Sequence, residues 1–123
     1  MDEDLLLFIK SSIRSVWALE ILLFMRRHRG RTWTREELAQ ELRSNTRLVA
    51  QVLAVFESAG LLIGHENGLM YAPASEALDE LSGRLQLAYQ ERPVAVVNAI
   101  VSSRADPLQT FADAFRLKGD PKT

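Results

Sequence analysis

Hydrophobic residues recur at steps of three and four along the first thirty positions, and they form two stripes. One stripe is Val16, Leu19, Leu22 and Leu23, and the other is Leu6, Ile9, Ile13, Trp17, Ile21 and Phe24. This spacing predicts a helix over residues 3–29, with a break near Ser11-Ser12. A helix with two apolar faces is covered on both sides. One face is expected to cover the elements that follow, and the other needs a further partner, either the C-terminal helices or a second subunit.

Two short helices joined by a tight turn are predicted next. Thr34 is a favoured N-cap residue, and Glu37 three positions later completes a capping box for a helix over about 35–43. Ser44-Asn45 supplies the turn and caps a second helix over about 46–58. The second helix has one apolar face, which consists of Val49, Val52, Leu53 and Phe56. This pattern is typical of a helix-turn-helix.

Ala59-Gly60 is expected to end the second helix. A two-stranded hairpin is predicted directly after it. Short strands are expected over residues 61–65 and 69–72, with Asn67-Gly68 between them. This dipeptide is the strongest short-range hairpin signal, since both central positions of a type I′ turn need positive φ. A helix-turn-helix followed by a hairpin is the outline of a winged helix.

Three more helices are predicted in the C-terminal half. One runs over about 75–90, and the next begins at Pro93, which suits a first helical position. A break over residues 102–105 separates them from a last helix that begins at Asp106-Pro107. The apolar stripes of these helices are Leu78, Leu81, Leu85 and Ala88; Val94, Val97, Ile100 and Val101; and Leu108, Phe111, Ala112 and Phe115.

The predicted fold is mainly α with a small β-hairpin, a winged helix-turn-helix with additional N- and C-terminal helices. Residues 1–13 are expected to form an N-terminal helical extension and residues 14–73 the winged helix-turn-helix domain. Residues 74–118 supply C-terminal helices for dimerisation or docking, and residues 119–123 form a tail.

Composition narrows the class of protein. Of the 123 residues, 47% are hydrophobic, which is enough for a core, and the absence of cysteine excludes disulfides and thiolate sites. The N-terminus, Met1-Asp2-Glu3-Asp4, lacks the positive charge of a secretory signal. The apolar run over residues 16–25 contains Glu20 and is too short to span a bilayer. We therefore expect a cytoplasmic protein that does not insert into a membrane.

Charge is distributed unevenly along the chain. The formal net charge is −1, yet residues 26–47 hold seven arginines against three glutamates. A basic band on a neutral chain is compatible with phosphate contact. The alternative is an ordinary solvated arginine-rich surface.

Nothing in the sequence indicates catalysis or a cofactor. His28 and His65 lack carboxylate or cysteine neighbours at ligand spacing, so no metal site is predicted. The glycines lie singly, without a glycine-rich phosphate loop, and no motif marks a nucleophile. We expect that the chain is not an enzyme.

The segments Glu37-Leu38-Ala39, 49–56 and Ser58-Ala59-Gly60-Leu61-Leu62 resemble the winged helix-turn-helix superfamily, as in bacterial regulators of the MarR and ArsR type. The resemblance covers roughly residues 14–73. It implies that the second helix lies in the major groove of DNA, with its early residues at base edges. The side chains that this placement assigns to DNA are Arg31, Arg35, Asn45, Thr46, Arg47 and Gln51, with His65 and Asn67 on the wing.

Two functions from different classes remain open. The first is sequence-specific binding of duplex DNA by a homodimeric transcriptional regulator. The second is an adaptor that binds a protein partner, and Glu66 at the wing tip favours it because phosphate repels a carboxylate. The candidate dimer or partner interface is Trp17, Ile21, Phe24, Leu78, Leu81, Leu85, Phe111 and Phe115.

Overall fold

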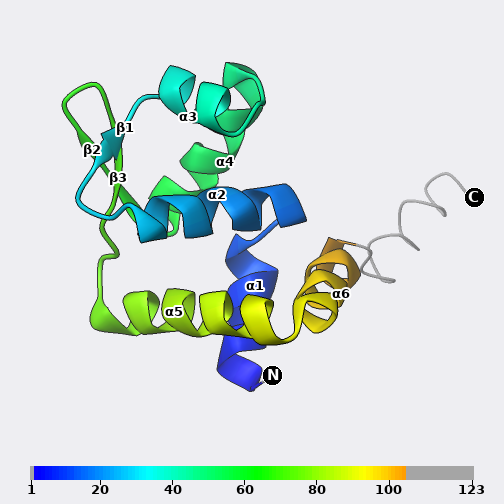
Figure 1. Cartoon of the computed structure of the whole chain (residues 1–123). Helices are drawn as coiled ribbons and strands as arrows, with labels where there is room; N and C mark the ends of the chain where they lie inside the picture. The colour runs from blue at the N-terminus through cyan, green and yellow to red at the C-terminus, as the bar shows by residue number, and fades with distance from the viewer. Residues whose placement is uncertain (1, 105–123) are drawn as a thin grey trace, which may run out of the picture.

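Six helices and three short strands make up residues 2–104, the part of the chain that this computed structural model describes (Figure 1). In chain order the elements are α1 (Glu3–Ser12), α2 (Val16–Arg27), β1 (Thr32–Trp33), α3 (Arg35–Glu41), α4 (Thr46–Ser58), β2 (Leu62–His65), β3 (Gly68–Tyr71), α5 (Glu76–Glu91) and α6 (Pro93–Arg104). The protein is therefore mainly helical with a small antiparallel sheet, which confirms the coarse fold class predicted from the sequence.

Helix α2 lies between two layers (Figure 1). The helices α3 and α4 and the sheet lie on one side of it, and α5 lies on the other, where α1 packs against α5 and α6. Both faces of α2 contribute to the core, because its buried residues are Ala18, Leu19, Ile21, Leu22, Leu23 and Met25. The two-faced helix predicted from the hydrophobic stripes is confirmed, and the second face is covered by helices of the same chain.

Side-chain caps set the starts of the helices. In five of the six described helices, one polar side chain accepts a hydrogen bond from the backbone N–H three residues further on: Asp2, Ser15, Thr34, Asn45 and Ser75. Thr34 and Glu37 form the predicted capping box. Each cap satisfies a backbone donor that the first helical turn leaves free. The cap at Ser15 also explains why the expected N-terminal helix divides into α1 and α2.

The hairpin turn lies one residue earlier than predicted. His65 pairs with Gly68, so the two loop residues are Glu66 and Asn67, and the positive φ of 54° is at Glu66. Gly68 serves another purpose, because a Cβ atom there would lie 2.3 Å from the carbonyl oxygen of Trp33. The glycine therefore permits the close approach of a neighbouring strand.

That neighbouring strand is β1, which was not predicted from the sequence. Thr32 pairs with Met70 and Trp33 pairs with Leu69, so the sheet has three strands in the order β1-β3-β2. The predicted two-stranded hairpin is thus incomplete. A strand of two residues carries no periodic signal, and only its partner in β3 defines it.

Helix α6 differs from its prediction in length and in face. It continues through residues 102–104, where a break was expected, and it buries Val96 and Ile100. Val94 and Val101, which were placed in the buried stripe, are 71% and 53% exposed. The predicted last helix, with Phe111 and Phe115, lies outside the described residues.

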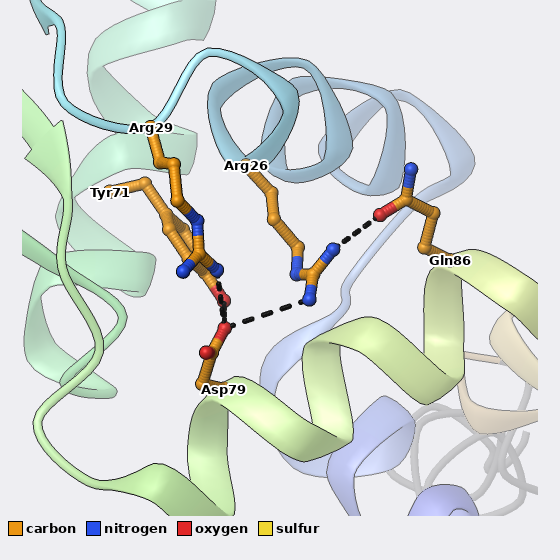
Figure 2. Close-up of polar contacts among 5 residues, drawn as sticks. All are labelled: Arg26, Arg29, Tyr71, Asp79 and Gln86. Carbon is orange, nitrogen blue, oxygen red and sulfur yellow. Dashed lines mark hydrogen bonds and ion pairs between the residues drawn. The ribbon is translucent and has the colours of Figure 1, made fainter.

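A polar cluster around Asp79 ties α2, β3 and α5 together (Figure 2). Its Oδ1 atom accepts hydrogen bonds from Arg29 at 2.6 Å and from the Tyr71 hydroxyl at 2.9 Å. Arg26 lies 3.7 Å from the same oxygen and donates to Gln86 at 2.5 Å. One carboxylate thus joins the end of α2, the base of the sheet and the first turns of α5.

The electrostatics of the cluster follow from these contacts. The hydrogen bonds from Arg29 and Tyr71 lower the pKa of Asp79, because they stabilise its charged form. Burial raises the pKa of the Tyr71 hydroxyl, which therefore stays protonated and keeps donating. Asp79 is about one-third exposed, with 35% of its side-chain surface accessible, so solvent screens part of the charge interaction.

The Asp79→Asn variant is expected to be less stable by about 1 kcal/mol at pH 7, through weaker hydrogen bonds to charged partners. The folded-state pKa of Asp79 is lowered, so its contribution is present above the unfolded value of about 3.9 and is lost as the pH falls through the folded pKa. Urea unfolding between pH 3 and 8 measures this difference. Glu80→Gln, at an exposed neighbour, is the control and is expected to change stability by less than about 0.5 kcal/mol.

Candidate nucleic-acid interface

Helix α4 presents the predicted site residues on the face opposite to its core contacts. Val49, Leu53 and Phe56 are buried, whereas the side chains assigned to DNA on this helix and at its cap are exposed: Asn45, Thr46, Arg47 and Gln51. Asn45 also has a local role, because its Oδ1 atom accepts a hydrogen bond from the Leu48 N–H at 2.9 Å. The first two turns of α4 are therefore an accessible surface, polar except for Leu48, on a helix whose other face is packed.

The turn into α4 holds a non-glycine residue in the left-handed conformation. Arg43 has φ 55°, and Ser44 N–H donates to the Ala39 carbonyl at 2.8 Å. The same hydrogen-bond pattern ends α4, where Leu61 N–H donates to Phe56 and the left-handed residue is Gly60, with φ 82°. Glycine adopts this conformation without a steric cost, whereas arginine does not.

This comparison of the two turns singles out Arg43. Two equivalent helix ends in one chain use glycine in one place and arginine in the other. Strain at an exposed polar residue is often retained where the side chain has a role. The sequence reading counted Arg43 in the basic band but did not assign it to the interface.

The seven arginines of the basic band, over residues 26–47, divide into those that contact other side chains and those that are exposed without an ion pair. Arg26 and Arg29 are held by Asp79. The guanidinium carbon of Arg31 lies 3.7 Å from the centre of the Trp33 ring, and its Nη2 atom lies 3.9 Å from Glu37. Four members of the band form no ion pair within residues 2–104 and are exposed: Arg27, Arg35, Arg43 and Arg47. The predicted band is therefore partly structural, and Arg31 is less available for phosphate than the sequence indicated.

The predicted site residues fall on two sides of α4. Arg35 and Asn67 line one pocket of about 460 Å³ together with Glu36 and Glu57. The carboxylates give that side, toward the sheet, an acidic character.

On the other side of α4, Gln51 lines a pocket of about 250 Å³ with Arg14 and Ser15 from the connection between α1 and α2. Arg14 is exposed and was not predicted as a site residue. It is far from α4 in sequence, and only the packing of α1 and α2 brings it there. The basic part of the surface therefore lies at the start of α4 and beside Arg14.

The tip of the hairpin is polar and carries opposite charges. His65 and Asn67 are exposed as predicted, and the His65 Nε2 atom lies 3.9 Å from a carboxylate oxygen of Glu66. Glu66 projects into solvent, with 80% of its side-chain surface exposed. The nearest titratable neighbour of His65 on the hairpin is thus an acid.

The candidate dimer or partner residues are largely covered within one chain. Ile21 and Leu85 are fully buried, so neither can form a surface contact, and their assignment to an interface is corrected. Trp17, Phe24, Leu78 and Leu81 are half-buried against the core. The large apolar side chains that are exposed in the described residues are instead Leu6, Leu7, Leu48, Ile63, Leu87, Val94 and Val101.

Comparison with known proteins identifies no relative. No protein-family model matches the chain, and searches of curated proteins and of solved structures find no match either. Within residues 2–104, no helix combines the length and hydropathy needed to cross a membrane. The same residues contain no group of three or more histidine, aspartate or glutamate side chains placed to hold a metal ion.

Arg43→Gly is expected to raise the free energy of unfolding by about 0.5–1 kcal/mol, because relief of the left-handed conformation exceeds the added freedom of the unfolded chain. Thermal or urea unfolding measures the change. The matched control is Gly60→Ala, which places a side chain in the same conformation at the end of α4 and is expected to destabilise. A destabilised Arg43→Gly protein would show that the side chain itself holds the turn.

Proposed function

We propose that the protein is a winged helix-turn-helix that binds duplex DNA with the N-terminal part of α4 and regulates transcription. Support comes from the arrangement of a helix, a short turn, an exposed polar helix and a three-stranded sheet beside it. The observation that carries the proposal is the exposed cluster of Arg47, Gln51 and Arg43 at the start of a helix whose opposite face is anchored in the core. An α-helix presented in this way fits the major groove.

The distribution of charge indicates how DNA would approach. Arg43 and Arg47 lie at the start of α4, and Arg14 lies on its side away from the sheet, so phosphates would be attracted there. Glu36, Glu57 and Glu66 lie toward the sheet and the wing tip and would repel them. The duplex would therefore contact α4 and the connection between α1 and α2, and the wing would contribute little to phosphate binding. Arg47 and Gln51 would read bases, through guanine and adenine edges respectively.

A homodimer would place two such helices on successive turns of the duplex, about 34 Å apart. The outer face of α6 suits this contact. Val94 and Val101 lie seven residues apart, on one face of the helix, and both are more than half exposed. Pairing of this face with its copy would cover apolar surface that the single chain leaves in water.

A protein partner is the second candidate for the same α4 and wing surface. Leu48 and Ile63 are 45% and 46% exposed beside the polar residues, and Glu66 stands at the wing tip. Binding through such apolar side chains would change little with salt, whereas binding through arginines would weaken steeply.

Fluorescence anisotropy with labelled duplexes from the gene's own promoter region tests the DNA proposal. We expect the affinity of the dimer to fall with salt at a log–log slope of about −4, for phosphate contacts by Arg43 and Arg14 of each subunit. The double change Arg47→Ala and Gln51→Ala should remove sequence preference, whereas Arg14→Ala should weaken all sequences alike. Arg92→Ala, at an exposed arginine after α5, is the matched control and should bind as the wild type does. Failure of the dimeric protein to bind at low salt would contradict the proposal.

Light scattering tests the dimer. We expect the wild type to have twice the monomer mass at tens of micromolar, because pairing of the two α6 faces would bury their exposed apolar side chains. Val94→Glu combined with Val101→Glu should yield a folded monomer, because charges cannot be buried against their own copies. A wild-type monomer at that concentration would exclude the α6 interface.

A further inference from the structure

A groove between α1 and α5 leaves apolar side chains open to solvent. Its volume is about 680 Å³, and its walls come from two helices that cross in the layer below α2. Leu7 from α1 is 58% exposed, and Leu78 and Leu81 from α5 are half-buried in the floor. Ala59, at the C-terminal end of α4, also lines the groove.

The rim of the groove is acidic. Asp4 on the α1 wall and Glu80 on the α5 wall are exposed, and neither forms an ion pair within the described residues. Arg84 also lines the groove, but its guanidinium is paired with Asp2. The charge that remains for a ligand is therefore negative, with one carboxylate on each side of an apolar floor.

An amphipathic helix with basic flanks matches this arrangement. Helix α1 has ten residues and spans about 15 Å, which accommodates roughly two to three turns of a partner helix. Side chains at positions i, i+3, i+4 and i+7 of such a helix form one apolar ridge. Lysine or arginine beside that ridge would lie near Asp4 and Glu80.

A second copy of this chain is a poorer occupant. A two-fold contact brings the same patch of both subunits together, so the acidic rims formed by Asp4 and Glu80 would meet each other. Like charges in an interface are unfavourable and select against that pairing. The charge of the rim therefore favours a different protein.

We infer that the groove between α1 and α5 docks a basic amphipathic helix of a partner protein, with apolar side chains against Leu7, Leu78 and Leu81 and basic side chains beside Asp4 and Glu80. The inference goes beyond the proposed DNA binding, because it concerns another surface. The groove reaches the C-terminal end of α4, whereas Arg43 and Arg47 lie at its N-terminal end, about 20 Å away along thirteen residues. The protein would then connect a bound duplex to a second protein.

Three synthetic peptides of about 16 residues, roughly 24 Å long as helices, test the inference against the full chain. The first has leucines at helical spacing flanked by lysines, the second replaces the lysines with glutamates, and the third has the composition of the first in scrambled order. Anisotropy measures affinity, and amide chemical shifts locate the binding surface. We expect the first peptide to bind about tenfold more tightly than the other two, with shifts along α1 and α5.

Variants distinguish peptide binding in the groove from nonspecific hydrophobic binding elsewhere on the protein. Leu7→Ser should weaken the first peptide by about five- to tenfold, whereas the matched control Leu87→Ser, a similarly exposed leucine outside the groove, should not. Asp4→Asn combined with Glu80→Gln should reduce the preference for lysine over glutamate flanks to about twofold or less. Glu41→Gln, on α3, is the matched charge control. Arg47→Ala should leave peptide binding unchanged, so failure here is distinguishable from failure of the DNA proposal.

Several results would overturn the inference. Equal binding of the lysine and glutamate peptides would exclude the charged rim, and shifts confined to α4 or the wing would place binding elsewhere. If neither peptide binds, the groove is not a docking site for a basic helix. Conversion of a dimer to a monomer by Leu7→Ser would identify a second copy as the occupant. Shifts along α1 and α5 on deletion of residues 106–123 would identify the chain's own C-terminal segment.

Discussion

Helix α2 is buried on both of its faces, and the two layers of the fold pack against it. Apolar residues on one face pack under α4 and the sheet, and those on the other pack toward α5. The Asp79 cluster strengthens the second contact, since it joins the end of α2 to β3 and α5 through Arg26, Arg29 and Tyr71. Helix α4 thus keeps its inner face anchored in the core while Asn45, Arg47 and Gln51 stay exposed on its outer face.

The fold also separates the structural arginines from those that remain accessible. Arg26 and Arg29, near the end of α2, are paired with Asp79, whereas Arg43 and Arg47 are exposed at the start of α4. A count of arginines along the sequence cannot make this distinction. The left-handed Arg43, compared with Gly60 at the equivalent end of α4, adds a second sign that the turn into α4 serves more than folding. The charge pattern and the strained turn thus indicate the same small surface.

Local features of the fold could be predicted from the sequence, and features set by distant contacts could not. The capping box of Thr34 and Glu37 and the start of α4 at Asn45 depend on neighbouring residues, and they were predicted correctly. The predicted register of the hairpin turn was wrong because a glycine is needed at position 68 for the close approach of Trp33, some 35 positions earlier. Strand β1 was missed because it too is defined by a distant contact, its pairing with β3. Among candidate site residues, the exposed face of α4 followed from helical spacing. The position of Arg14 beside Gln51 could not be predicted in this way. The hydrogen bond from Arg29 to Asp79, 50 positions away, could not be predicted either.

The proposed DNA surface consists of Arg43 and Arg47 at the start of α4 and of Arg14 on the side of that helix away from the sheet. Amide chemical-shift mapping during titration with a duplex at low salt tests it most directly, because it reports the location of contact. DNA binding at this surface would shift the amide signals of residues 43–51 and of residues around Arg14, with little change along the groove between α1 and α5. Shifts confined to the wing or to α5 and α6, or no shifts at all, would contradict it.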